Sequence, residues 1–524
     1  MQWKNYRYNQ TEEGIVIEAF LESDEEEIVI PEQIDGYPVV EIGAEAFSEY
    51  GAALSKITVP ATVQKIGDGA FKMCMSLTEL ELSEGLTHIG TEAFYLTALS
   101  ELTIPYTLET IEQAWEHGNI RWHVALDHPV FCSDGYGLYQ NKDGQRELLV
   151  VYQPDERTSY EVLPGTTIIG ENAFAGNGSL RSVRLPDTVQ MIREAAFENC
   201  QTLEIIELQE GLKIIGVNAF SHCIRLREIH LPASLKKLER LALSDTFGWS
   251  DTLNGLERVT VAQGSDCYEA DDCALFEKHP MGRSIVKYFG HERTYTVPED
   301  VTQILESAFR RADFHRLVLP ASLEKVEAQA FAECKQLEQI DLAETDTKLY
   351  VPRMPVYRKD EITALLYERD PQAEALAFDT TELPLKWQQF ARTAIYKKQK
   401  DETVLRSHVF DYRGYDALFH TYLNLSDQCG MACCRLRYPV ELKDEVREKY
   451  TAFLQEHLDA ILAELAEAED LFHLAEICEL GFVHAENVEN CMELFNQREK
   501  TKLLGYLMDF KAEHIGNAEF DFEL

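Results

Sequence analysis

The sequence predicts a multidomain α+β protein: a β-solenoid of short parallel strands followed by an all-α domain of helical hairpins. Two observations lead to this fold class. A six-residue pattern recurs along the chain, as "IGDGAF" at Ile66–Phe71, "IGTEAF" at Ile89–Phe94 and "IGENAF" at Ile169–Phe174. After about residue 370 this repeat disappears, and apolar residues recur at steps of three and four, as on one face of a helix.

The repeat keeps a constant register around its Ala-Phe pair. Within each run the Phe residues are 22 to 24 residues apart, a period typical of leucine-rich repeats: Phe47, Phe71, Phe94; Phe174, Phe197, Phe220; Phe309, Phe331. An alternating run such as "LRSVRL" (Leu180–Leu185) follows and predicts a short strand, and Pro186 ends it because proline donates no ladder hydrogen bond. Stacked coils would bury each Phe, so we expect the Phe residues in the core.

A cysteine lies three residues after the Phe in four of the coils, at Cys74, Cys200, Cys223 and Cys334. One thiol per coil forms a row and not a tetrahedral cluster, so we expect buried, reduced side chains and no metal there.

The complete unit, seen in "LRSVRLPDTVQMIREAAFENC" (Leu180–Cys200), resembles the BspA-like leucine-rich repeat family over roughly the first 370 residues. The resemblance implies an N-terminal cap over 1–40 and a solenoid over 41–370. It also implies longer hairpin units near 128–165, 265–298 and 345–370, and degenerate coils around Ile111–Trp115 and Leu238–Leu243. The family is associated with bacterial cell-surface proteins that bind host or neighbouring-cell components.

Residues 375–524 are expected to form the helical domain. From Val446 to Leu462 apolar residues recur at helical steps, and Gly481 is the expected helix stop. Further helices are expected at Leu385–Lys400, Tyr415–Leu425, Asp427–Arg437, Glu486–Asn496 and Lys500–His514. Short links between them indicate hairpins packed side by side.

Charge and composition exclude several functions. The formal net charge of -42 argues against nucleic acid and anionic membranes, which both require basic surfaces. No window approaches the ~20 apolar residues that span a bilayer, and the first residues contain no signal segment, so we expect a cytoplasmic protein without membrane insertion.

Candidate reactive sites are few. Cys429, Cys433 and Cys434, with His420 upstream, are the nearest approach to a metal cluster, but buried apolar thiols explain them better. The run "DEEE" (Asp24–Glu27) lacks the pattern of a calcium loop, and the basic island Tyr396–Lys400 with Arg392 is expected to be a solvated helix face; a docking patch for an acidic partner is the alternative. We therefore expect no catalytic residues, no metal and no cofactor.

A binding surface follows from the strand pattern. Apolar residues of each strand point inward, so the residues between them form a ladder across neighbouring coils. This ladder mixes charges with an exposed Ile205, and its candidate binding residues are Arg184, Glu207, Glu228, His230, Arg258 and Arg316.

We therefore expect a non-catalytic scaffold that holds a protein partner on this ladder, while the helical domain caps the array or recruits a second partner. A secreted or surface-associated adhesin is the alternative that the family resemblance implies. An enzyme with its site in the helical domain is the third possibility, because sequence alone does not show pockets.

Overall fold

The structure is a computed structural model that describes residues 1–21, 25–48, 53–115, 119–153, 157–243, 256–327, 330–331, 334, 336–343, 347–350, 412–419 and 425–515. A β-solenoid of about 13 turns extends over residues 15–342, and a helical region with seven α-helices in the described part follows it. The predicted fold class is confirmed. Contacts divide the chain into two compact units, Met1–Asp272 and Cys273–Leu524, which are described separately.

Most coils of the first unit contribute one strand to each of two faces. The strands of the LxxLxL pattern form what we call the front face: β4 (Glu27–Val29), β7 (Lys56–Val59), β9 (Glu79–Leu82), β11 (Glu101–Thr103), β13 (Arg121–His123), β17 (Ser159–Glu161), β19 (Ser182–Arg184), β21 (Ile205–Glu207), β23 (Glu228–Leu231) and β25 (Arg258–Val261). They pair in parallel within the sheets β4-β7-β9, β11-β13, β17-β19-β21 and β23-β25.

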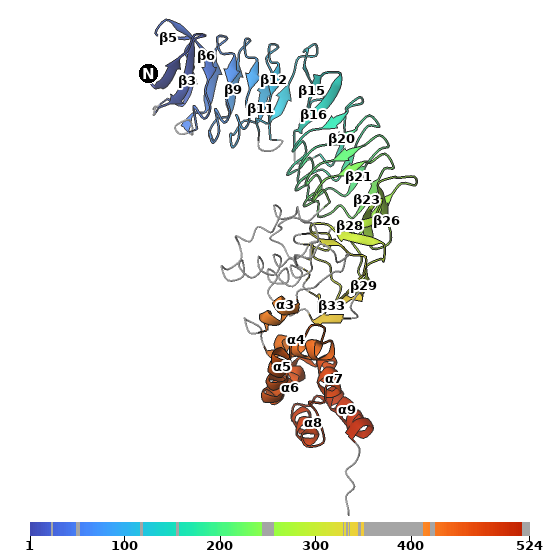
Figure 1. The fold of residues 1–524 in the computed structure, drawn as a ribbon. Helices are drawn as coiled ribbons and strands as arrows, with labels where there is room; N and C mark the ends of the chain where they lie inside the picture. Colours follow the sequence, from blue (N-terminus) through green and yellow to red (C-terminus); the bar gives the residue numbers. More distant parts are fainter. Residues whose placement is uncertain are drawn as a thin grey trace, which may run out of the picture. The chain divides into compact units, whose positions relative to one another are not determined.

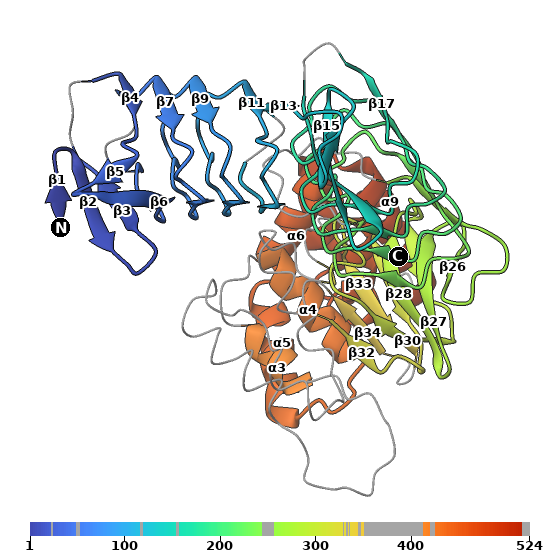
Figure 2. The same ribbon diagram turned by 90° about the horizontal axis from the view of Figure 1, so that it is seen from above.

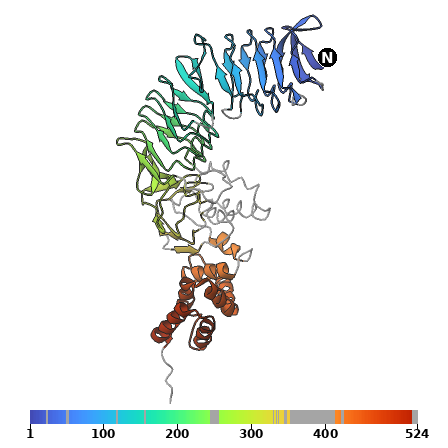
Figure 3. The same cartoon turned by 180° about the vertical axis from the view of Figure 1, so that it is seen from behind.

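The rear face consists of the short strands that end at the aliphatic residue of the repeat, which Gly follows in five of these eight strands. They are β6 (Tyr37–Ile42), β8 (Lys65–Ile66), β10 (His88–Ile89), β12 (Thr110–Ile111), β18 (Ile168–Ile169), β20 (Met191–Ile192), β22 (Ile214–Ile215) and β24 (Lys237–Leu238). Figure 2 shows β4, β7 and β9 along one edge of the coils and β3 and β6 along the other, and Figure 3 shows the coils from behind.

The repeated Phe residues form a stacked spine between the two faces. All of them are at most 4% exposed. Neighbouring rings lie 5.2 Å apart for Phe47 and Phe71, and 4.6 Å apart for Phe174 and Phe197. The prediction that these side chains are core is confirmed, because each ring packs on the ring of the next coil.

The recurrent cysteines hold neighbouring coils together. Each thiol donates a hydrogen bond to the backbone oxygen of the Phe one coil earlier, at 3.6 Å from Cys74 to Phe47 and 3.1 Å from Cys200 to Phe174. Cys223 and Cys334 make the same bond to Phe197 and Phe309. Burial raises the pKa of Cys74 to about 12, so this thiol stays protonated at neutral pH.

A left-handed backbone position explains one sequence difference between coils. The residue two after the Phe has φ between 54° and 71° in Met73, Leu96, Gly176 and Asn199. Gly and Asn adopt this conformation readily, whereas other residues pay roughly 1 kcal/mol or more. The turn geometry is therefore common to the coils, although the residues that build it are not.

In the first unit, antiparallel hairpins precede two stretches of coils, as the hairpin of β27 (Ala274–His279) and β28 (Gly282–Tyr288) precedes the coils of the second unit. At the N-terminus β1 (Gln2–Trp3), β2 (Tyr6–Gln10) and β3 (Ile15–Phe20) pair in this way, and β3 joins the parallel rear face through β6. Phe20 stacks on Phe47 at 5.1 Å, so the spine begins within residues 1–40. A short β5 (Gln33–Ile34) pairs with β6. β14 (Phe131–Ser133), β15 (Gly137–Lys142) and β16 (Gln145–Val151) repeat this arrangement within 128–165, and β26 (Tyr268–Ala270) lies near the end of the unit.

The second unit begins with further coils. Its rear-face strands are β27 (Ala274–His279), β28 (Gly282–Tyr288), β30 (Val301–Ile304) and β32 (Lys325–Val326). Its front-face strands are β29 (Thr294–Thr296), β31 (Arg316–Leu319) and β33 (Gln339–Leu342), and β34 (Thr347–Tyr350) adds an antiparallel partner to β33. The remainder of the hairpin expected near 345–370 and the helix expected at Leu385–Lys400 lie outside the described residues.

The helices of the second unit follow the coils in sequence (Figure 1). They are α3 (Tyr412–Leu418), α4 (Leu425–Arg437), α5 (Asp444–Glu456), α6 (Leu458–Ala468), α7 (Leu471–Glu479), α8 (Val488–Gln497) and α9 (Thr501–Phe510), which continues into the π-helical turn Lys511–Ile515. The helical spacing from Val446 to Leu462 passes without a break through His457, where α5 ends with φ −110°. Glu469 is left-handed, and Asp470 then caps α7 by accepting from the His473 amide at 3.1 Å.

Candidate binding surface

The residues between the apolar positions of the front-face strands point outward. On β17, β19 and β21 the buried row is Tyr160, Val183 and Ile206. On either side of it, parallel pairing aligns Glu161, Arg184 and Glu207 in one row and Ser159, Ser182 and Ile205 in the other. We call these six outward residues the middle face.

Arg184 lies at the centre of the middle face between two carboxylates. Its side chain is 68% exposed, and its guanidinium nitrogens lie 3.9 Å from an oxygen of Glu161 and 3.9 Å from an oxygen of Glu207. These distances exceed those of a hydrogen bond, so the carboxylates orient the guanidinium electrostatically without occupying its donors.

Ile205 is the apolar residue of this surface. It is 57% exposed, although β-branched apolar side chains usually avoid water. Its neighbour in the preceding coil is Ser182, whose side chain is small. The middle face therefore combines an apolar side chain with charges of both signs.

The remaining predicted ladder residues lie on two separate parts of the chain. Glu228 and Arg258 are exposed and adjacent in the register of β23 and β25. Nδ1 of His230 lies 2.8 Å from the Thr260 hydroxyl. Arg316 belongs to the second unit, where its Nε donates to the Asp341 carboxylate at 2.9 Å.

At its N-terminal end the front face includes a strand that was not identified from the repeat. β4 contributes Glu27 and Val29, which align with Lys56 and Thr58 on β7 and with Glu79 and Glu81 on β9. We call these six residues the N-terminal face. The signal was present in "EIVIP", Glu27–Pro31, where alternation and a closing Pro match the later coils, but the stretch lies within the predicted cap. Glu27, the last residue of the acidic run, begins the edge strand β4, where charges discourage pairing with other chains, and Asp24 lies outside the described residues.

Charges on the N-terminal face are paired with one another. The Lys56 ammonium lies 3.0 Å from the Glu79 carboxylate and 2.7 Å from the Glu81 carboxylate, and the Thr58 hydroxyl donates to Glu81 at 3.0 Å. Hydrogen bonds from Lys56 and Thr58 lower the pKa of Glu81, and the bonds to Glu81 and Glu79 raise that of Lys56.

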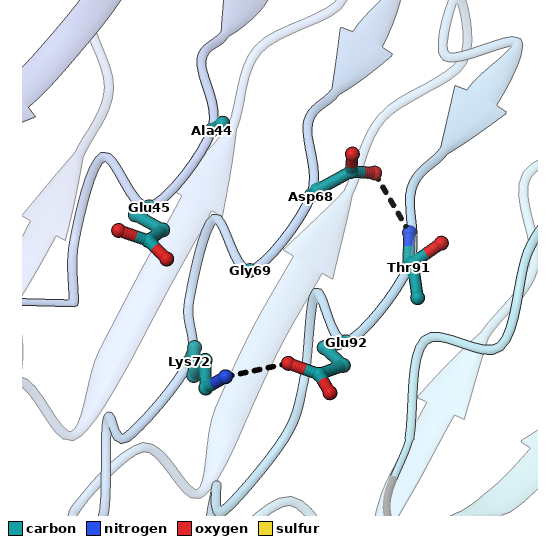
Figure 4. A pocket seen from close by; sticks show the side chains of 7 residues that line it. All are labelled: Ala44, Glu45, Asp68, Gly69, Lys72, Thr91 and Glu92. Atoms are coloured by element: carbon teal, nitrogen blue, oxygen red, sulfur yellow. Dashed lines mark hydrogen bonds and ion pairs between the residues drawn. The ribbon is translucent and has the colours of Figure 1, made fainter. Parts of the chain in front are cut away.

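A shallow pocket opens among the turns that carry the repeated motif (Figure 4). Its polar groups include Lys72, which pairs with Glu92 at 2.5 Å, and Asp68, which accepts from the Thr91 amide at 3.0 Å. Glu92 accounts for the raised pKa of Lys72. Since these groups bind one another across successive coils, they stabilise the coil stack.

The cysteine cluster on α4 is a buried pair. The sulfurs of Cys429 and Cys433 lie 3.9 Å apart, and both residues are at most 1% exposed. The hydrogen bond with Cys429, with burial, raises the pKa of Cys433. Cys434 is partly exposed, and His420 lies outside the described residues. Within the described ranges, no three His, Cys, Asp or Glu side chains form a possible metal site.

The polar core of the helical region is a closed network. Arg435 is fully buried and donates from Nε to Asp416 at 2.7 Å, and to the carbonyls of Tyr438 and Val440 at 3.1 and 3.0 Å. Tyr450 donates to the same carboxylate at 2.9 Å. Because these partners occupy its donors, Arg435 has a structural role in tying α3, α4 and α5 together.

Among the described helices, none is both long and apolar enough to cross a membrane.

Comparisons with known proteins agree with this architecture. The profile of the BspA type leucine rich repeat region matches in six copies, over residues 4–117, 153–260 and 289–351, which is more than half of the chain. No curated protein matches the sequence.

Similar solved structures include a leucine rich cell surface protein from Faecalibacterium prausnitzii, with 22% identity over 66% of this chain and 76% of that chain, and a TM-score of 0.31. The pneumococcal vaccine antigen PcpA has 19% identity over 62% and 73%, with a TM-score of 0.39. The leucine rich repeat protein of T. pallidum has 28% identity over 43% and 90%, with a TM-score of 0.27. The family model indicates no catalytic family. With the family profile in register with its coils, the chain belongs to the BspA-type leucine-rich repeat family.

Proposed function

We propose that this protein is a non-catalytic scaffold that binds a protein partner on the front face of its solenoid. The observation that carries the proposal is the middle face, where Arg184 is exposed between Glu161 and Glu207 and Ile205 is exposed beside them. Arginine with a nearby apolar anchor is typical of the residues that dominate the free energy of protein–protein binding.

A purely solvated surface would look different. Lys and Glu in self-paired arrangements keep a surface soluble, and the N-terminal face has this character. The middle face instead presents arginine donors that its own carboxylates do not occupy at hydrogen-bond distance. Glu207, Glu228, His230 and Arg258 extend the surface toward β25.

We also propose that the protein works in the cytoplasm. None of the twelve cysteines forms a disulfide, and the spine thiols use their hydrogen to bond a carbonyl of the neighbouring coil. A reducing compartment preserves these thiols. Detection of the native protein outside intact cells would contradict this location.

Affinity capture from the native cytoplasm tests the binding proposal. Wild-type protein is compared with the triple variant Arg184→Glu, His230→Glu, Arg258→Glu, and Lys56→Glu on the N-terminal face is the matched control. We expect the triple variant to lose a partner that wild type and control retain. A partner that all three proteins retain equally would show that the front face from β19 to β25 is not its binding site.

A further inference from the structure

We propose that the middle face binds an α-helix of the partner. This helix would lie across β17, β19 and β21 and present a row of three side chains that are basic, acidic and basic in turn. The inference rests on the proposed function and specifies the chemistry of the partner. It follows from three features of the middle face: the spacing of its charges, their order, and the position of Ile205.

The spacing of the coils favours a helix over an extended segment. The Phe174 and Phe197 rings, one coil apart, are separated by 4.6 Å, in line with the strand spacing of about 4.8 Å in a sheet. Glu161 and Glu207 are two coils apart, or about 9.6 Å. Seven residues of a helix rise about 10.5 Å and return to the same face. An extended chain presents same-side residues every ~6.7 Å. Its side chains therefore do not match the spacing of about 4.8 Å between coils.

The order of charges on the middle face determines the order of charges that the partner helix must present. Glu161, Arg184 and Glu207 alternate in sign along the coil axis. A partner helix therefore matches with Lys or Arg at positions i and i+7 and a carboxylate at i+4, which lie on one helix face. The central carboxylate can accept two parallel bonds from Arg184, a geometry that lysine does not offer.

Ile205 supplies the apolar contact beside this row. It lies two residues from Glu207 on β21, in the row that continues through Ser182 and Ser159. The serines leave room on one side of Ile205, so an apolar residue next to the partner's charged row can cover its exposed side chain. Apolar burial ringed by charges is the usual arrangement of a binding hot spot.

Designed peptides test the inference directly. The probe is a fluorescent, alanine-rich helix of about 20 residues, with Lys at i and i+7, Glu at i+4, and Leu at i+1, i+5 and i+8. One matched peptide exchanges Lys and Glu, and another carries a central proline that breaks the helix. Fluorescence anisotropy measures the affinity of each peptide for the full chain and for its variants. The test variants are the triple variant Arg184→Glu/Glu161→Lys/Glu207→Lys and the single variant Ile205→Ser. The control variants are Lys56→Glu and Val29→Ser.

We expect wild type to prefer the first peptide over the charge-exchanged peptide by about tenfold or more, because like charges in contact are costly. The triple variant should reverse this preference, Ile205→Ser should weaken both peptides, and the controls should match wild type. Equal affinity for the two charged peptides, or unchanged affinity of the proline peptide, would overturn the inference. Absence of binding to either charged peptide would also overturn it, but the scaffold proposal would stand if Arg184→Glu still releases the captured partner.

Discussion

The N-terminal face and the middle face are built on the same frame and differ in what they present. Each has three parallel strands in the same register over a stacked Phe spine. On the first, Lys56 lies within 3.0 Å of two carboxylates, whereas on the second Arg184 lies 3.9 Å from each of its two. The comparison teaches that the repeat determines where a side chain points. The outward residues within each repeat determine whether its charge is already paired with a neighbouring charge.

Loss of one spine ring should have the largest effect. Phe197→Ala removes a ring that stacks on Phe174 and Phe220, so we expect the free energy of unfolding to fall by about 3 to 5 kcal/mol. Phe71→Ala should cost a similar amount beside the N-terminal face, because Phe71 packs between the rings of Phe47 and Phe94 in the same way. Chemical denaturation measures both; a midpoint unchanged by either variant would contradict the shared frame.

Alkaline pH should weaken the spine next. Burial raises the pKa of Cys74 from 9.0 to about 12, so above pH 9 the unfolded chain loses this proton before the folded chain does. The stabilisation is therefore complete below pH 9 and is lost as the pH rises toward 12, with a slope of up to about 1.4 kcal/mol per pH unit from this thiol. Denaturation midpoints between pH 8 and pH 11 should fall less steeply in Cys74→Ala than in wild type; equal slopes would contradict the assignment.

Removing Lys56 or Arg184, the cation on the central strand of each face, should have the smallest effect on stability. The loss should be larger for Lys56 than for Arg184. Lys56→Ala breaks contacts to Glu79 and Glu81 and should lower the denaturation midpoint slightly at low salt. Arg184→Ala breaks only the two 3.9 Å contacts and should leave the midpoint unchanged. An equal loss in both variants would remove the proposed difference between the faces.

The sequence predicted the frame because the frame repeats. The register of Phe197, Cys200 and the strand after them follows from the need of each coil to bury the same side chains against its neighbour. The outward position of Arg184, Glu207 and His230 followed from strand alternation in the same way.

Whether each outward charge is paired with a neighbouring charge was not predictable from the repeat pattern. Lys56 and Arg184 both lie on the central strand of a three-stranded sheet, and only the three-dimensional positions of Glu81, Glu161 and Glu207 show which cation is engaged. The break at His457 was missed for a related reason, since apolar spacing continues through it while the backbone leaves the helix. The first strand of the N-terminal face was missed because it lies before the Ala-Phe pattern begins.

A comparison of Arg184→Glu with Lys56→Glu in partner binding tests the central claim most directly. The two variants make the same charge change on the central strand of each face, so net charge is matched. Titration of the captured partner against each protein should show a loss of affinity of about tenfold or more for Arg184→Glu and none for Lys56→Glu. Equal affinities of the two variants, whether both reduced or both unchanged, would contradict the claim that the middle face is the binding surface.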